Sequence, residues 1–158
     1  MMVSSAGYCV LHTDGGSRGN PGPAGSGFVL RDAAGTIVCT SGHYLGEATN
    51  NQAEYDGLVR GLEAALAHGC RRLRVRMDSE LIVKQMSGRY RVKNAGLKVF
   101  FLRASELVRR FEDVRFTHVF REENAEADAL ANQAMDACSD IGDALGSSAK
   151  DCRQESLF

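Results

Sequence analysis

Residues 11–25, LHTDGGSRGNPGPAG, decide how the rest of this chain is expected to fold. The apolar residues just before Asp14 indicate a buried strand, which ends at that acid. Residues 15–25 then hold five glycines and both prolines of the chain, a density typical of a tight turn. Such a loop exposes backbone N–H groups with little side-chain bulk, so it suits close approach to a phosphate. An acid beside it is either a solvated turn residue or part of a functional site.

Hydrophobic spacing along the chain predicts both strands and helices. Strands are expected at 7–14, 25–32, 36–45, 72–77 and 114–120, and helices at 51–68, 79–86, 97–111 and 124–138. The first three strands suit an antiparallel meander, whereas the later strand–helix–strand crossover implies parallel pairing. The expected fold class is therefore α/β, with a mixed five-stranded sheet flanked by helices. We expect one domain over residues 1–138 and a flexible C-terminal tail over residues 139–158.

The composition is typical of a soluble globular protein rather than a membrane-spanning one. The chain has 158 residues, of which 44% are hydrophobic and 25% are charged, and no apolar run reaches membrane length. Residues 1–7 lack the basic start and apolar core of a secretory signal. The five cysteines are scattered, with no CxxC pair. We therefore expect reduced thiols, no zinc site and a cytoplasmic monomer.

Basic side chains gather in two segments although the formal net charge is only −1. Four arginines lie between residues 71 and 76, and five lysines and arginines lie between residues 84 and 98. Each group is either a solvated face or a source of contacts to phosphates.

Four acids occupy positions from which their carboxylates could meet. Asp14 and Asp78 each follow a predicted strand, and the carboxyl ends of parallel strands lie at one edge of a sheet. Glu54 lies in the first turn of the long helix, on the same face as the leucines four and eight residues later. Asp128 lies in the first turns of the last helix. For Glu54 and Asp128, a contact with the helix dipole is the simpler alternative.

Carboxylates that converge repel one another and raise each other's pKa. Divalent cations remove that cost, and hard oxygen ligands select Mg²⁺ or Mn²⁺ over softer metals. Two such ions can activate water on one side of a phosphodiester and stabilise the leaving oxygen on the other. The acids therefore indicate metal-dependent phosphodiester hydrolysis.

Four segments, residues 13–23, 49–54, 78–79 and 124–128, resemble in order the signatures of the ribonuclease HI family. The resemblance covers roughly residues 8–138. It implies the ribonuclease H fold and an endoribonuclease that cuts the RNA strand of RNA/DNA hybrids, leaving a 5′-phosphate and a 3′-hydroxyl. It also implies that two Mg²⁺ or Mn²⁺ ions are held by Asp14, Glu54, Asp78 and Asp128, with Asp14 bridging both.

The same resemblance assigns contacts with the substrate. Side-chain amides can donate to and accept from the 2′-hydroxyl, the group that distinguishes RNA from DNA. The family positions that read the minor groove of the hybrid match Gly15, Asn50, Asn51 and Gln52, and those that contact phosphates match Asn20 and Thr49. Simple capping of the helix is the alternative for the asparagines.

The sequence departs from the family pattern in three places. Glu80 stands where many relatives have a glutamine that contacts a base or sugar. Residues 88–96 form a short segment, so we expect the basic helical protrusion of the best-known bacterial members to be absent. Relatives also carry a mobile histidine before the last catalytic acid, and His118 has a compatible spacing. The strand-like alternation of residues 116–120 predicts that His118 is packed, so we favour Arg121 over His118 for assisting product release or contacting a phosphate.

Two other functions remain open: a nuclease of the same fold acting on another duplex, and a module that only binds hybrid or double-stranded RNA. The presence of all four acids favours an enzyme. The chain ends in QESLF, where Gln154, Leu157 and Phe158 resemble the short motif by which bacterial replication and repair proteins bind the sliding clamp. The alternative is that the two apolar residues pack on their own domain.

Overall fold

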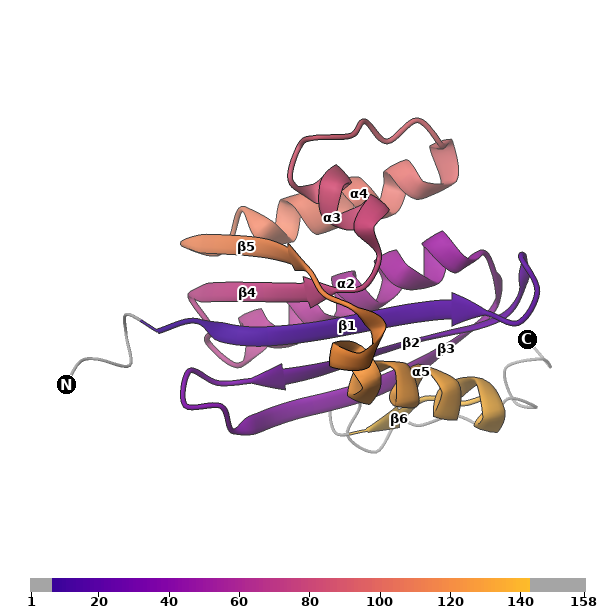
Figure 1. The fold of residues 1–158 in the computed structure, drawn as a ribbon, viewed down its shortest axis with the longest axis horizontal. Helices are drawn as coiled ribbons and strands as arrows, with labels where there is room; N and C mark the ends of the chain where they lie inside the picture. The colour runs from indigo at the N-terminus through magenta and orange to yellow at the C-terminus, as the bar shows by residue number, and fades with distance from the viewer. Residues whose placement is uncertain (1–6, 143–158) are drawn as a thin grey trace.

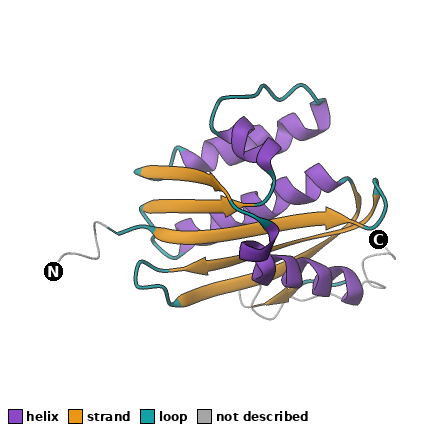
Figure 2. Ribbon diagram, in the orientation of Figure 1, coloured by secondary structure: helices purple, strands orange, loops and turns teal. Residues whose placement is uncertain are grey.

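The computed structural model describes residues 7–142 as a twisted sheet with helices on both of its faces (Figure 1). Three strands come first along the chain, and helices are interspersed with strands only after them (Figure 2). The elements, in chain order, are β1 (Cys9–Ser17), β2 (Gly22–Arg31), β3 (Ile37–Ala48), α2 (Asn50–Ala67), β4 (Arg72–Met77), α3 (Glu80–Met86), α4 (Ala95–Val108), β5 (Asp113–His118), the short 3₁₀ helix η1 (Arg121–Asn124), α5 (Ala125–Ala137) and β6 (Ile141–Gly142).

The strands form one mixed sheet in the order β5-β4-β1-β2-β3-β6. β1 pairs antiparallel with β2, and β2 pairs antiparallel with β3, as expected for a meander. After helix α2 the chain returns to pair β4 in parallel with β1, and β5 lies parallel beside β4. The predicted α/β class and mixed sheet are confirmed, with one strand more than the five expected.

The additional strand, β6, lies beyond the predicted domain boundary at residue 138. Its two residues, Ile141 and Gly142, pair antiparallel with Gly42 and Ser41 of β3. Two residues are too few to show a hydrophobic period, so no sequence pattern predicts this strand. Residues 139–142 therefore belong to the fold rather than to the tail, and residues 143–158 lie outside the described part of the chain.

The main hydrophobic core lies between the sheet and the helices α2, α3 and α4; α2 passes behind the sheet in Figure 1, and α3 and α4 lie toward the top of the view. Leu58, Leu62 and Ala65 of α2 are fully buried because their spacing places them on one face of the helix. The three apolar residues of β4 are likewise buried, and they alternate with arginines that point to the other face. Helix α5 covers that other face over β1, β2 and β3. No helix within residues 7–142 is long and apolar enough to cross a membrane.

Most of the glycine-rich stretch is strand rather than the predicted loop. β1 extends to Ser17 and β2 begins at Gly22, so only residues 18–21 lie between them. A Cβ atom at Gly15 would lie 2.2 Å from the carbonyl oxygen of Ala53 in α2, and one at Gly27 would lie 2.4 Å from that of Ala127 in α5. Glycine is needed here because two helices approach the strands closely.

Cys9 and Cys70 form a disulfide, with their Cα atoms 6.2 Å apart. The expectation that all thiols are reduced is therefore wrong for this pair. The bond joins the start of β1 to a residue two positions before β4, and Cys9 pairs with Leu73 in the parallel register of the two strands. Because that register is a long-range feature, the scattered cysteine spacing did not indicate the pairing.

Candidate active site

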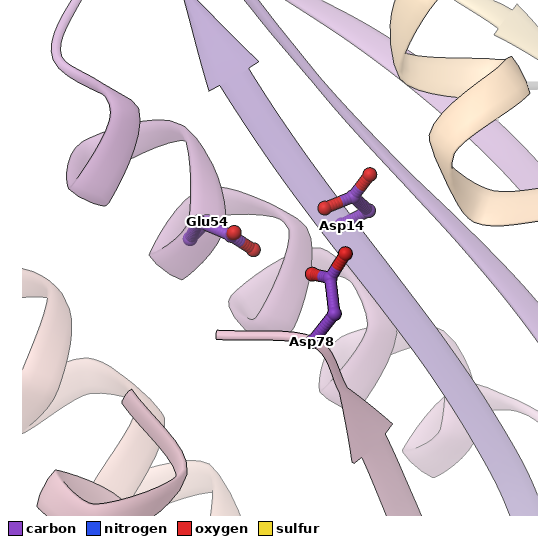
Figure 3. A group of neighbouring side chains, drawn as sticks. All are labelled: Asp14, Glu54 and Asp78. Carbon is purple, nitrogen blue, oxygen red and sulfur yellow. The ribbon is translucent and has the colours of Figure 1, made fainter. Parts of the chain in front are cut away.

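Three carboxylates from three elements converge at one edge of the sheet: Asp14, Glu54 and Asp78 (Figure 3). One oxygen from each lies within 4.8 Å of the others. Asp14 lies on β1 and Asp78 directly follows β4, and the parallel register that pairs Thr13 with Met77 brings the two acids side by side. The prediction that Asp14 and Asp78 meet is confirmed, although β1 continues to Ser17, so Asp14 lies within its strand and not at the end.

Glu54 reaches the cluster because the start of α2 is fixed against β1. Thr49 caps the helix in a capping box, in which its hydroxyl accepts from the Gln52 N–H and the Gln52 side chain accepts from the Thr49 N–H. The absence of a side chain at Gly15 lets the Ala53–Glu54 backbone approach the strand. Glu54 therefore sits on the core-facing side of the helix, opposite Asp14.

Asp128 lies on the wall of the same cleft rather than within the group of three. The cleft has a volume of about 550 Å³ and is lined by all four acids. Helix α5 begins next to β1 because the buried side chain of Asn124 donates a hydrogen bond to the carbonyl oxygen of Thr13 at 2.7 Å. Asp128 is close enough to Asp14 to share a hydrogen bond with it. The fourth acid thus reaches the cluster through Asp14.

Burial and mutual repulsion perturb two of the acids. Burial, the negative charge of Asp78 and the hydrogen bond with Asp128 together raise the pKa of Asp14 to about 8, while the hydrogen bond from the Gly15 N–H acts in the opposite direction. The pKa of Glu54 is raised well above its usual range. Burial is the largest cause, and the negative charges of Asp14 and Asp78 are the next largest. The positive charge of Arg121 opposes the rise at Glu54.

These properties fit a site for hard divalent cations. One carboxylate oxygen of Glu54, Oε1, is buried and has no hydrogen-bond partner among the described residues. A buried, unpartnered acceptor beside two other carboxylates is costly unless a positive charge joins it. The donors are all carboxylate oxygens, which are the ligands that Mg²⁺ and Mn²⁺ prefer.

The amides predicted to contact substrate are largely engaged within the protein. Asn50 Oδ1 accepts from the Ser17 N–H at 2.8 Å, and Asn20 Oδ1 accepts from the Asn50 N–H at 3.0 Å. These bonds hold the β1–β2 turn against the start of α2. Of the six residues assigned to substrate contacts, Gly15 and Asn50 line the cleft. The alternative that the asparagines cap the helix is wrong, because Thr49 and Gln52 form the cap, and the substrate roles of all six residues stay predictions.

His118 is exposed, so the expectation that it is packed is wrong. β5 ends at His118 in the structure. The imidazole ring of His118 packs edge-on against the ring of Phe120, which is itself exposed. β5 is an edge strand of the sheet, so the outward side chains at its end are not covered by a neighbouring strand. Both His118 and Arg121 line the cleft, and which of them assists the reaction stays a prediction.

The polar residues of the cleft wall that were not predicted include Arg18 and Asn132. Arg18 Nη2 lies 2.7 Å from Asp136 Oδ1 and 3.4 Å from Asn132 Oδ1. The sequence does carry part of the signal, since Asp128, Asn132 and Asp136 recur every four residues and so share one face of α5. No local pattern indicated that Arg18 would meet that face.

Comparisons with known proteins agree with this fold and site. Residues 12–134 match a family described as reverse transcriptase-like. A ribonuclease HI of Halobacterium salinarum is 49% identical over 123 residues, which cover 78% of this chain and 62% of the relative. The chain spans only 41% to 62% of the length of the first curated relatives that it matches.

Solved structures give the same result. The N-terminal RNase H domain of a Mycobacterium tuberculosis protein is 46% identical, with a TM-score of 0.81, and the match covers 84% of this chain and 96% of that domain's chain. LC11-RNase H1, solved in complex with an RNA/DNA hybrid, is 45% identical with a TM-score of 0.79, and the match covers 83% of this chain and 99% of LC11-RNase H1.

Proposed function

The chain belongs to the ribonuclease HI family, and we propose that it is an endoribonuclease that hydrolyses the RNA strand of RNA/DNA hybrids. The observation that carries the proposal is the convergence of Asp14, Glu54 and Asp78 within 4.8 Å in a cleft open to solvent. A module that only binds duplexes has no need of three mutually repelling acids, one of them with a buried, unpartnered oxygen. The hybrid bound to LC11-RNase H1, a protein 45% identical, supports this choice of substrate.

We propose Mg²⁺ or Mn²⁺, as two ions, for the cofactor. Asp14, Glu54 and Asp78 would hold them, and Asp128 would contribute from the cleft wall. When bound, such ions supply activation of water and stabilisation of the leaving oxygen of a phosphodiester. The raised pKa values of Asp14 and Glu54 mean that cation binding at neutral pH is accompanied by release of protons.

The chain's own residues would bind and orient the substrate. The Gly15 N–H faces the carboxylates, and Gly15 lines the cleft in which the sugar–phosphate backbone of the RNA would lie. Asn50, held by Ser17, lies at the cleft wall, where an amide can recognise a 2′-hydroxyl. Arg121 reaches the same cleft and opposes negative charge near Glu54.

A cleavage panel tests the proposal. The full chain is incubated with RNA/DNA hybrid, double-stranded RNA and double-stranded DNA of one sequence, each with Mg²⁺, with Mn²⁺ and with excess chelator. We expect cutting of the RNA strand of the hybrid in both metals and none in chelator. Cutting of double-stranded DNA in preference to the hybrid would support the alternative of a nuclease for another duplex, and no cutting at all would leave only a binding function.

We also propose that the enzyme acts in the cytoplasm and that its C-terminal residues bind the sliding clamp. Gln154, Leu157 and Phe158 lie outside the described residues, so this proposal rests on the sequence motif alone. Tethering to a clamp would raise the effective concentration of the enzyme at newly made DNA. A peptide of residues 149–158 is titrated against the clamp, beside the same peptide with Leu157→Ala and Phe158→Ala. Equal signals from the two peptides would show that the tail is not a clamp ligand.

A further inference from the structure

Arg18 places a guanidinium group on the wall of the catalytic cleft. The residue lies in the turn between β1 and β2, and it lines the same cleft as the four acids. Its side chain crosses to helix α5, where Nη2 meets Asp136 Oδ1 at 2.7 Å and Asn132 Oδ1 at 3.4 Å. The turn and the helix thus meet through a single arginine beside the carboxylates.

The guanidinium has donors to spare. Both of its contacts within residues 7–142 use Nη2, which leaves Nε and Nη1 without a partner there. The side chain of Arg18 is 47% exposed and that of Asp136 is 68% exposed. An ion pair so exposed stabilises the fold very little. The contact with α5 is therefore better explained as a means of orienting the arginine than as a stabilising bond.

Rigid backbone on both sides fixes where this arginine lies. The turn is closed by a hydrogen bond from the Arg18 N–H to the Pro23 carbonyl oxygen at 2.8 Å. Ser17, next to it, is bonded to Asn50 at the start of α2. On the opposite side, α5 packs so closely on β2 that a Cβ at Gly25 would lie 2.7 Å from the Ala131 carbonyl oxygen. This packing holds Asn132, the next residue of α5, beside the β1–β2 turn, where it contacts Arg18.

Asn132 also connects the arginine to the catalytic acids. Its Nδ2 donates to the backbone carbonyl oxygen of Asp128 at 3.0 Å, while its Oδ1 accepts from Arg18. The side-chain amide is therefore oriented by the same helical turn that carries Asp128. An arginine aligned in this way keeps a constant position relative to the acids.

We propose that Arg18 forms a phosphate-binding subsite on the α5 side of the cleft, which takes a backbone phosphate of the duplex next to the one being cut. Asn132 and Asp136 are positioning residues that hold its guanidinium ready. The proposal rests on the proposed function, because it assumes a nucleic-acid substrate in the cleft. A guanidinium fork binds phosphate through two parallel N–H bonds, and the donors left unpaired at Arg18 suit that geometry.

The test compares Arg18→Ala with Arg109→Ala in the full chain. Arg109 is an exposed arginine at the C-terminal end of α4, just before β5 begins, whereas the cleft lies at the other end of β5. Binding of a labelled RNA/DNA hybrid is measured by fluorescence anisotropy in excess chelator, over a range of salt concentrations. We expect Arg18→Ala to weaken binding about tenfold and to make the slope of log K against log salt shallower by about 1, as for the loss of one phosphate contact. Arg109→Ala should change neither quantity.

A purely structural role for Arg18 would leave the salt slope unchanged, so the slope distinguishes the two explanations. Thermal unfolding of Arg18→Ala shows whether the variant is folded. In steady-state cleavage with Mg²⁺, we expect its KM to rise about tenfold with kcat within about twofold of wild type. Arg18→Lys keeps the charge and should restore the salt slope, but only part of the affinity.

The positioning role is tested by a double-mutant cycle. If Asn132 and Asp136 act through Arg18, then Arg18→Ala should have a smaller effect in an Asn132→Ala/Asp136→Asn background than in wild type. Equal affinity and equal salt slope for wild type and Arg18→Ala would overturn the subsite. Equal effects of Arg18→Ala in both backgrounds would overturn the positioning role. A wild-type protein that neither binds nor cuts the hybrid would instead refute the proposed function.

Discussion

Replacing Asp14 by asparagine tests how strongly the clustered acids oppose folding. The Asp14 side chain is 6% exposed, and burial and the neighbouring charge of Asp78 raise its pKa from 3.8 to about 8. Between these two pH values the folded protein binds more protons at Asp14 than the unfolded chain does. The free energy of unfolding must therefore fall as the pH rises from about 4 to about 8. Asparagine has nearly the same shape but carries no charge, so the variant should lose this dependence.

The size of the effect follows from the shift. Each pKa unit corresponds to about 1.36 kcal/mol. At pH 7 Asp14 is ionised in the unfolded chain but largely protonated in the folded protein, and this difference lowers the stability of the metal-free wild type by at most about 4 kcal/mol. Removal of the Asp14 charge also lowers the pKa of Glu54, because Asp14 is the second largest cause of its rise after burial. Water entering the open cleft reduces the effect. We expect Asp14→Asn to be about 2 to 4 kcal/mol more stable than wild type at pH 7 and nearly equal to it at pH 4.

The assay is urea unfolding of both proteins in excess chelator at pH values from 4 to 8. The stability difference should grow steadily with pH, and addition of Mg²⁺ should stabilise the wild type more than the variant. The same variant should have no detectable cleavage of hybrid. A constant difference across the pH range would show that Asp14 is not repelled in the folded protein, and cleavage by the folded variant would refute its catalytic role.

Three further sets of variants probe other parts of the account. Arg121→Ala should lower kcat about tenfold or more, because Arg121 offsets negative charge near Glu54. His118→Ala should lower kcat less, and the opposite order of the two kcat values would favour the histidine as the assisting residue. Gly15→Ala should lose both stability, by about 1 to 3 kcal/mol or more, and activity, because its Cβ would lie 2.2 Å from a backbone oxygen of α2. Gly16→Ala is the matched control, since its Cβ would meet only a side-chain oxygen at 3.7 Å, and equal losses in both variants would contradict the close-approach argument. Cys70→Ser should lower the stability of the oxidised protein by about 2 to 4 kcal/mol in urea unfolding, because the disulfide closes a long loop; equal stability of the variant and the oxidised wild type would show that the bond contributes nothing.

The parts of the fold and site that could be predicted depend on local signals. The alternation of arginine and apolar residues identified β4 with the same bounds as in the structure. The strand ends predicted from the sequence identified Asp14 and Asp78, which the parallel pairing of β1 and β4 brings together. The helical period placed Glu54 on the core-facing side of α2. These residues meet because the crossover through α2 places β4 parallel to β1 and beside it, an arrangement that general rules of chain connection predict without knowledge of side-chain contacts.

The parts that were missed depend on contacts between distant segments. The glycines of β1 and β2 resemble a loop in sequence, yet Gly15 and Gly27 are strand residues shaped by helices far along the chain. The Cys9–Cys70 disulfide is likewise set by the packing of the whole sheet. The contact between Arg18 and α5 spans more than a hundred residues of sequence, so no local pattern contains it.

The chemical ends of the cleaved RNA test the central claim most directly. A hybrid with a labelled RNA strand is cut by the full chain in Mg²⁺, and the ends of both fragments are identified. Hydrolysis by water at a cluster of carboxylates that hold metal ions predicts a 5′-phosphate on one fragment and a 3′-hydroxyl on the other, with an uncut DNA strand and no products in chelator. A 2′,3′-cyclic phosphate would contradict the account, because it would mean that the RNA's own 2′-hydroxyl attacked and that Asp14, Glu54 and Asp78 do not perform the reaction proposed for them.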